Sequence, residues 1–269
     1  MPPLSLSSSS QLIIRNIDTF ELDHLLMIGL PADQLLIQLL NGGVGKVTAL
    51  SRDFSDYRRL KPLQNEFKDH FSLTFAPTLE GEFSSTVDGV LLFLQKSKPL
   101  MDFWLQMIIH HVPDNVPIWL VGENDEGIKS WKKRLKKSFN HVNSVDNARH
   151  CVLLVACEPL KCTEVFDVQE FCKVFNIQAI DQTLTVYSLP GVFSHGRLDT
   201  GTKVLLETLK DLPAGKILDF GCGAGVISAY ISTLPEEHEF TLVDCDALAL
   251  ASSRKTISAL GVKGVCVIP

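Results

Sequence analysis

One stretch near the end of the sequence constrains the fold more than any other. A mostly apolar run of strand length, Lys216–Phe220, leads into a glycine-rich turn, and a helical stretch, Ala224–Ser232, follows. The turn has the pattern Asp219-x-Gly221-x-Gly223-x-Gly225. Glycines permit positive φ angles and let a ligand approach the backbone, and the following helix start offers free N–H groups. This order of elements predicts a binding site at the edge of a parallel sheet.

An acidic residue follows the turn at the distance such a site requires. Asp244 comes directly after a second apolar run, Phe240–Val243, where an acid about 20 positions after the glycines would accept ribose hydroxyls. The D-x-G-x-G-x-G spacing resembles that of methyltransferases that use S-adenosylmethionine (SAM). Nicotinamide enzymes have G-x-G-x-x-G, with the third glycine one residue later. The alternatives are a nicotinamide site and a tight turn without a ligand.

The remaining patterns predict two α/β parts. In the first, the runs Val90–Leu94 and Ile118–Val121 flank a helical stretch, Pro99–His111, as in parallel α/β structure. Leu35–Leu40 predicts a further helix, and Cys151–Ala156 a buried strand. We expect a disordered serine-rich tail at 1–10, a first domain at 11–160, a linker with a short helix (Val168–Phe175) at 161–177, and a second domain at 178–269.

The pattern of the second part predicts the first half of a doubly wound sheet. Its strands are predicted at Thr183–Leu189, Lys216–Phe220, Phe240–Val243 and Val265–Ile268, and its helices at Thr202–Leu209, Ala224–Ser232 and Ala247–Leu260. Such sheets have a second half beyond the point where the strand order reverses. We therefore expect two tandem Rossmann-like α/β domains, the second one incomplete, with Lys216–Phe220 as an exposed edge strand.

Composition narrows the functional classes. The chain is 45% hydrophobic and 21% charged with a net charge of −6, which suits a protein with a sizeable core and leaves nucleic-acid contacts to a local basic patch. It has seven cysteines and no C-x-x-C pair, which predicts free thiols in the cytoplasm and no metal site. No apolar run reaches the roughly 18 residues of a membrane span.

A second glycine-bearing loop lies upstream, at Gly191–Thr202. Asp199 can cap the helix that follows it, which is the structural interpretation of the loop. The alternative interpretation is a role beside the cofactor.

From Gly191 to Ile268 the sequence resembles the ribosomal RNA small subunit methyltransferase C family, whose members methylate N2 of a guanine in 16S rRNA. The shared motifs are the loop GVFS…LD.G and the strand and turn LD.GCGAGV.S. Val121-Gly122-Glu123-Asn124 and Val145-Asp146 are similar to that family's N-terminal domain. The resemblance implies an N-terminal domain with a degenerate methyltransferase fold that binds no SAM and supports RNA binding. The residues implied in SAM binding are Asp199, Gly201, Thr202, Asp219, Gly221, Cys222, Gly223, Gly225 and Asp244.

One departure from the family concerns catalysis. The family's Asn-Pro-Pro-Phe motif does not occur before the sequence ends at Pro269, so no catalytic residue is assigned, and residues 1–269 alone are expected to be inactive. The resemblance implies 16S rRNA or the small ribosomal subunit as partner, with a monomeric protein in the cytoplasm. The alternatives are a non-catalytic RNA-binding or folding-helper module and another SAM-dependent N-methyltransferase.

A basic stretch is the candidate RNA contact. Lysines recur at helical spacing with no acid among them, a pattern typical of a solvated helix face or of a face that contacts phosphates. They are Lys129, Lys132, Lys133, Lys136 and Lys137. Two other patterns predict only structure: Asn41–Lys46 lacks the residues of a phosphate-binding loop and predicts a helix-ending turn, and His110-His111 has no metal-ligand neighbours.

Overall fold

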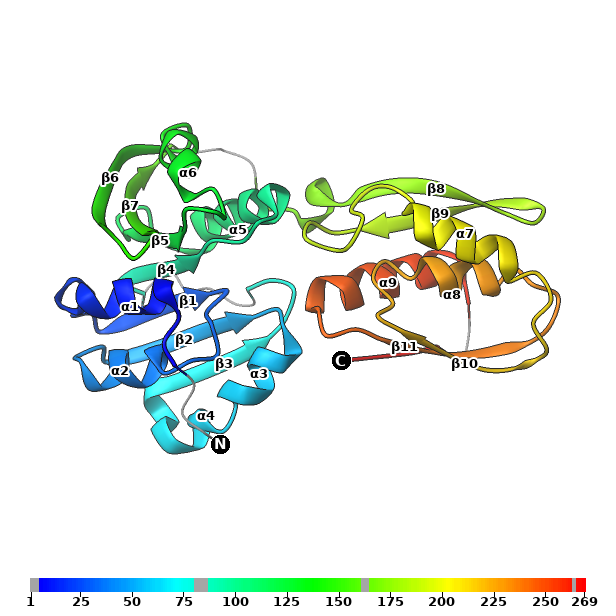
Figure 1. Ribbon diagram of the computed structural model, residues 1–269, viewed down its shortest axis with the longest axis horizontal. Coiled ribbons are helices and arrows are strands. Elements are labelled where there is room, and N and C mark those ends of the chain that lie inside the picture. The colour runs from blue at the N-terminus through cyan, green and yellow to red at the C-terminus, as the bar shows by residue number, and fades with distance from the viewer. Residues whose placement is uncertain (1–4, 80–86, 161–164, 263–264) are drawn as a thin grey trace. The chain divides into compact units, whose positions relative to one another are not determined.

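The computed structural model describes residues 5–79, 87–160, 165–262 and 265–269. The chain forms two compact α/β units, one up to Phe166 and one comprising Asp167–Pro269 together with Arg52–Phe54. The division falls inside the segment 161–177 that the sequence predicts to be a linker. Figure 1 labels the elements of both units, and each unit is described by itself. No helix in the described part of the chain is long and apolar enough to span a membrane.

The first unit is built on a seven-stranded sheet in the order β3-β2-β1-β4-β5-β7-β6 in the described part of the chain (Figure 1). The strands β1 to β5 are parallel, and β7 runs antiparallel to both β5 and β6. The strands are β1 His24–Ile28, β2 Lys46–Ser51, β3 Phe71–Phe75, β4 Gly89–Phe93, β5 Ile118–Glu123, β6 Phe139–Ala148 and β7 Cys151–Pro159. The order reverses at β1, where a doubly wound fold normally opens a crevice.

Helices flank this sheet. They are α1 Ser8–Arg15, α2 Leu35–Asn41, α3 Phe54–Leu60, α4 Leu63–Phe67, α5 Lys98–His111 and α6 Ile128–Leu135. Short 3-10 turns lie at Ile17–Phe20 and Lys68–His70. As predicted, 41–46 ends a helix: Gly42 caps α2, and β2 begins at Lys46. His110 and His111 hydrogen-bond through Nδ1 to carbonyl oxygens one turn earlier, in agreement with a structural role.

In the first unit, an aromatic side chain packs at the point where the strand order reverses. Gly29 follows β1 directly with φ +70°, and a Cβ atom there would meet the ring of Trp104 at 3.0 Å. Trp104 comes from α5 and is 2% exposed. The side chain therefore occupies the space above β1 that would have to be open to admit a nucleotide.

The prediction of a disordered tail at 1–10 is wrong in part. Ser8–Ser10 form the first turn of α1, and the Ser7 hydroxyl accepts a hydrogen bond of 3.1 Å from the backbone N–H of Ser10. Leu12 and Ile13 are fully buried and hold the helix on the unit. Serine composition suggested disorder, but the same residue type is a preferred helix N-cap. Residues 1–4 of the expected tail lie outside the described residues.

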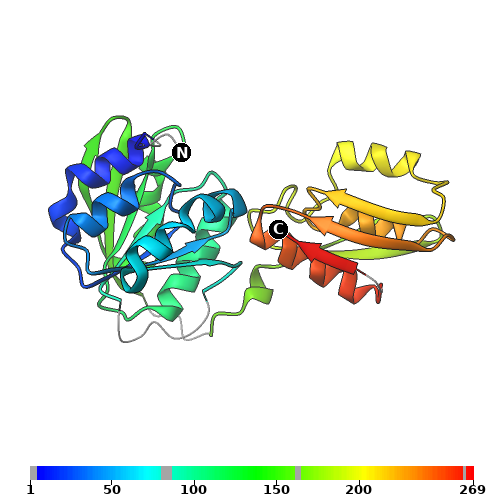
Figure 2. The same ribbon diagram turned by 90° about the horizontal axis from the view of Figure 1, so that it is seen from below.

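The second unit contains a three-stranded parallel sheet, ordered β10-β11-β12 among the described residues. These strands are Gly215–Phe220, His238–Val243 and Val265–Ile268, and Figure 2 shows them side by side. The helices are α7 Thr200–Thr208, α8 Val226–Ile231 and α9 Ala247–Ala259. Within the described part β10 pairs only with β11, and Leu218 and Phe220 on it are 63% and 83% exposed, as expected for an edge strand.

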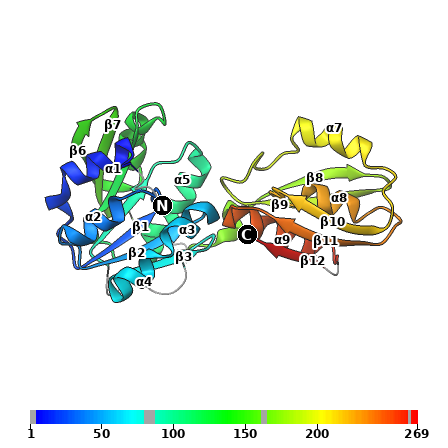
Figure 3. The ribbon, with the colours of Figure 1, turned by 60° about the horizontal axis from the view of Figure 1, so that its bottom comes forward.

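A two-stranded antiparallel hairpin replaces the short helix expected at Val168–Phe175. A 3-10 turn occupies Val168–Phe171, and β8 (Lys173–Ala179) then pairs with β9 (Gln182–Ser188). The backbone N–H groups of Tyr187 and Leu189 donate to Thr256 Oγ1 (3.0 Å) and Ser252 Oγ (2.9 Å) on α9. The hairpin therefore lies along α9 (Figure 3), a tertiary contact that local sequence patterns do not report.

Candidate cofactor site

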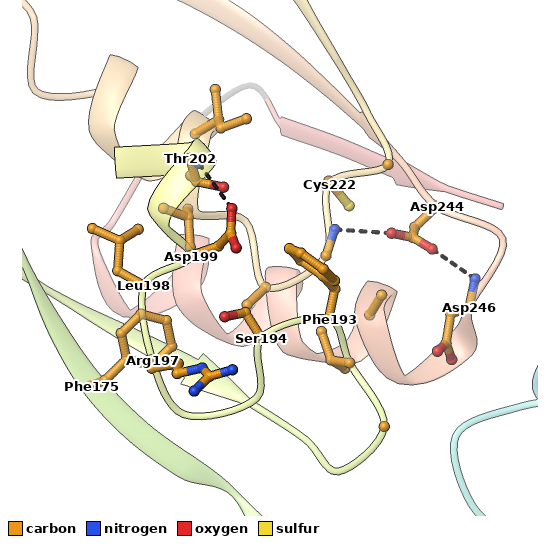
Figure 4. Close-up of a pocket in the computed structure, with 18 residues that line it drawn as sticks. Phe175, Phe193, Ser194, Arg197, Leu198, Asp199, Thr202, Cys222, Asp244 and Asp246 are labelled. Atoms are coloured by element: carbon orange, nitrogen blue, oxygen red, sulfur yellow. Dashed lines mark hydrogen bonds between the residues drawn. The ribbon is translucent and has the colours of Figure 1, made fainter. Parts of the chain in front are cut away.

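The second unit contains a cavity of about 420 Å³, within the range of roughly 300–1,000 Å³ usual for small-molecule sites. It lies where β10 and β11 end and α8 begins (Figure 4). Its walls come from the glycine turn, from the ends of β11 and α9, and from the loop before α7. The lining residues include Gly191, Val192, Phe193, Ser194, Arg197, Leu198, Asp199, Thr202, Gly221, Cys222, Gly223, Ala224, Asp244 and Asp246.

The glycine turn forms one wall. The N–H groups of Gly221 and Cys222 donate to the carbonyl oxygen of Val243 at 2.7 and 3.0 Å, which fixes the turn against the end of β11. Gly221 and Gly223 have φ angles of +78° and +53°, in the left-handed region that favours glycine. No atom lies within 4 Å of a Cβ built on either residue. The backbone at these two positions is therefore open to a ligand.

Gly225 serves a different purpose from the other two glycines. It precedes α8 with φ +77°, and a Cβ there would lie 3.2 Å from Cβ of Ser253 on α9. It does not line the cavity. This glycine allows α8 and α9 to pack closely.

Asp244 lies in the cavity wall with its carboxylate already oriented. Its Oδ2 accepts a hydrogen bond of 2.9 Å from the N–H of Gly223, and its Oδ1 accepts one of 2.9 Å from the N–H of Asp246 (Figure 4). A carboxylate has about four acceptor positions, so both oxygens can accept further hydrogen bonds. This is the arrangement required to receive the two hydroxyls of a ribose.

Asp219 is buried behind the turn and does not line the cavity. It is 6% exposed, and its Oδ2 accepts hydrogen bonds from the N–H (3.3 Å) and the hydroxyl (2.7 Å) of Ser228 on α8. Burial raises the pKa of this carboxyl group above its usual range. Asp219 joins β10 to α8, so the structure gives it a positioning contact where the sequence resemblance implied a cofactor contact.

The loop before α7 supplies Asp199 and Thr202 to the cavity wall. Asp199 is the N-cap of α7 and accepts a hydrogen bond of 3.1 Å from the N–H of Thr202. Gly201 follows in the first turn and does not line the cavity. Asp199 can therefore both cap α7 and contact a ligand in the cavity, because its carboxylate keeps free acceptor positions after capping.

Cys222 lines the cavity as a neutral thiol. Burial raises its pKa to about 12, so the thiolate, which is the nucleophilic form, is scarce at neutral pH. Within the described ranges there is no group of three or more His, Cys, Asp or Glu residues that could hold a metal ion.

Several lining residues were not predicted individually. Phe193, Ser194, Arg197 and Leu198 belong to the glycine-bearing loop that the sequence singled out, but no spacing distinguished them. Arg197 is the cationic side chain among the described lining residues. The lysines predicted to contact RNA belong to the first unit, on α6 and the turn after it.

The cavity suits the ribose and the amino-acid part of SAM. Asp244 suits the ribose, the open backbone at Gly221 and Gly223 admits a close ligand, and Asp199 and Arg197 can complement the charges of an amino acid.

Comparison with known proteins agrees with this fold. Residues 10–175 match the family model of the methyltransferase small domain N-terminal, and residues 183–268 match that of the methyltransferase small domain. The ribosomal RNA small subunit methyltransferase C of Colwellia psychrerythraea is 36% identical over 97% of this chain and 74% of its own. That of Stutzerimonas stutzeri is 39% identical over 94% and 71%. The chain belongs to the ribosomal RNA small subunit methyltransferase C family.

A solved structure from this family shares the fold. It is the T. thermophilus 16S rRNA N2 G1207 methyltransferase in complex with AdoMet and guanosine, with a TM-score of 0.79. The two chains are 17% identical, and the match covers 97% of this chain and 68% of that one. The expected α/β methyltransferase fold is confirmed. That residues 1–269 alone are inactive stays a prediction.

Proposed function

We propose that this protein transfers the methyl group of SAM to the N2 amine of a guanine in the 16S rRNA of the small ribosomal subunit. The observation that carries the proposal is the hydrogen bond between Gly223 and Asp244 in the wall of an open cavity. It joins the two parts of the predicted cofactor motif. Membership of the methyltransferase C family supports the choice of substrate.

Each cofactor-binding residue then has a distinct part. Asp244 accepts the ribose hydroxyls, and Gly221, Cys222 and Gly223 form the surface against which the cofactor lies. Asp199 and Thr202 face its amino-acid end. Asp219, Gly201 and Gly225 act indirectly, since they shape the turn and the start of α7 without lining the cavity.

Catalysis in this proposal is mainly positioning. SAM supplies an electrophilic methyl group, and the guanine amine is the nucleophile. The cavity residues hold the cofactor in one orientation, so that the amine can approach in line with the bond that breaks. A guanine paired in a helix cannot reach such a site, so the target base has to leave its stack.

The lysines of the first unit are the proposed contact with RNA phosphates. Helix α6 buries Ile128, Trp131 and Leu135, which anchor the helix to the unit. Lys129, Lys133, Lys136 and Lys137 are exposed and Lys132 is half-buried, and among the described residues none of these lysines forms an ion pair with a carboxylate. Arg134 differs, because it pairs with Asp102. Unpaired cations on one face suit a phosphate backbone.

The place of action follows from the proposed substrate. A protein that modifies 16S rRNA works in the cytoplasm, where the small subunit is assembled. We propose that it acts there as a monomer.

Labelled methyl transfer tests the proposed function. A chain in which residues 1–269 are continued by the second half of the sheet is incubated with methyl-labelled SAM and small subunits that lack the modification, with residues 1–269 alone in parallel, and the RNA is digested to nucleosides. We expect the label in N2-methylguanosine, and its loss with Asp244→Ala. Label in another nucleoside would overturn the proposed target. RNA binding without any transfer would favour the non-catalytic module instead.

A further inference from the structure

Phe193 is a large apolar side chain at the rim of the cofactor cavity. It lines the cavity and is nevertheless 75% exposed, whereas the neighbouring Val192 is 4% exposed. Figure 4 draws its ring between Asp199 and Asp244. Phe220 is also exposed, but it does not line the cavity. Phe193 therefore combines two properties: contact with the site and an open aromatic surface.

The backbone of the loop accounts for this exposure. Gly191, Ser194 and Gly196 have φ angles of +87°, +55° and +79°, so the chain turns sharply on both sides of Phe193. A left-handed conformation is unfavourable for a residue with a Cβ atom, such as Ser194. The surrounding structure holds it in place, since the N–H of Arg197 donates to the carbonyl oxygen of Ser194 at 3.0 Å.

The loop is anchored at both ends. At its start, the N–H of Leu189 donates to Ser252 on α9 at 2.9 Å. Within it, Nδ1 of His195 lies 3.2 Å from the hydroxyl of Ser188. At its end, Asp199 caps α7. The aromatic ring is thus presented from a fixed base, which lowers the ordering cost of binding a flat ligand.

We propose that Phe193 is a stacking platform for the purine base that receives the methyl group. This inference rests on the proposed function. A base that has left its stack exposes two flat faces, and aromatic side chains commonly cover such faces in RNA-binding proteins. The ring lies at the rim, where a base arriving from solvent meets the protein.

The test separates base binding from cofactor binding. Phe193→Leu and Phe193→Tyr are compared with wild type, and Ile180→Ala serves as control because Ile180 is 54% exposed and lies outside the cavity lining. Calorimetry measures the affinity for S-adenosylhomocysteine, and then for guanosine in its presence. Labelled transfer gives KM and kcat for small subunits.

We expect Phe193→Leu to weaken guanosine binding and kcat/KM by roughly ten- to a hundredfold, the usual scale for one stacked base, while the affinity for S-adenosylhomocysteine is kept. Phe193→Tyr keeps an aromatic face and should stay close to wild type, as should Ile180→Ala. If affinity for S-adenosylhomocysteine falls in parallel, the ring contacts the cofactor and the inference is wrong.

The remaining outcome also decides the matter. Wild-type protein that forms N2-methylguanosine while Phe193→Leu performs equally well overturns the stacking role and leaves the proposed function intact. Wild-type protein that modifies no guanine overturns the proposed function itself, and with it the base that Phe193 would hold.

Discussion

The carboxylate of Asp244 accepts a hydrogen bond of 2.9 Å from the backbone N–H of Gly223, 21 residues earlier in the chain. The contact ties the acid at the end of β11 to the turn after β10, and a second bond from the N–H of Asp246 holds the other oxygen. The acid is therefore oriented before any ligand binds. A ligand that uses Asp244 does not have to order it first.

The two acids of the motif should respond differently to substitution. Asp244→Ala removes a cavity-lining acceptor and should weaken SAM binding by about 1–3 kcal/mol, because ligand hydroxyls lose their partner. Asp219→Asn should have a much smaller effect, because Asp219 contacts Ser228 behind the turn. Calorimetric titration with SAM measures both. Equal losses for the two variants would mean that Asp219 takes part directly in cofactor binding.

Substitutions of the turn glycines should also differ in their effects. Gly225→Ala places a methyl group 3.2 Å from Ser253 at φ +77° and should lower the free energy of unfolding by about 1–3 kcal/mol. Gly223→Ala should lose some stability because φ is +53° there, but its methyl group meets no atom, so we expect a smaller loss than for Gly225→Ala together with weaker SAM binding. Gly215→Ala is the control, since nothing lies within 4 Å of its Cβ position. Urea unfolding measures the stability of each variant, and calorimetry measures its affinity for SAM. A Gly225→Ala variant as stable as Gly215→Ala would contradict this account.

Local patterns predicted the elements around the site because each is continuous in sequence. The turn at Gly221–Gly225 and the acid at Asp244 lie where the glycine motif and its spacing placed them, and α9 lies where the helical stretch was predicted. The direction of Asp219 could not be predicted, since it depends on how α8 packs. Phe193 was missed for a related reason: only the positive φ angles of a folded loop turn that ring outward.

The first unit shows the same limit of sequence patterns. The strands β1 to β3 are short and were not singled out, and their order in the sheet depends on long-range pairing. That this unit binds no SAM was implied by the family resemblance and stays a prediction, and the packing of Trp104 on Gly29 is a contact that sequence patterns did not indicate. No local signal pairs residues so far apart in the chain.

The loop that carries Phe193 should lose stability in acid. Burial lowers the pKa of His195, and the charge of Lys173 adds to this effect. The unfolded chain then binds the proton more readily, so stability is complete above the ordinary histidine pKa of about 6.5 and is lost as pH falls below it. His195→Asn should show a smaller loss of unfolding free energy between about pH 7.5 and pH 5.5. If the unfolding free energies of wild type and His195→Asn depend on pH in the same way, His195 does not cause the loss of stability in acid.

The basic face of α6 should contribute to the salt dependence of RNA binding. Replacing Lys133 and Lys136 by Gln should weaken binding and flatten the slope of log affinity against log salt by roughly 0.7–0.9 per lost phosphate contact. Lys61→Gln with Lys68→Gln removes the same charge elsewhere in the first unit and is the matched control. If both double variants give the same slope, α6 is only a solvated face.

A structure with S-adenosylhomocysteine bound tests the central claim most directly. The account predicts the ligand in the cavity of about 420 Å³, with its ribose hydroxyls within hydrogen-bond distance of Asp244 and its amino-acid end between the glycine turn and Asp199. Binding anywhere else, or in this cavity with Asp244 left without contact to the ribose, would contradict it.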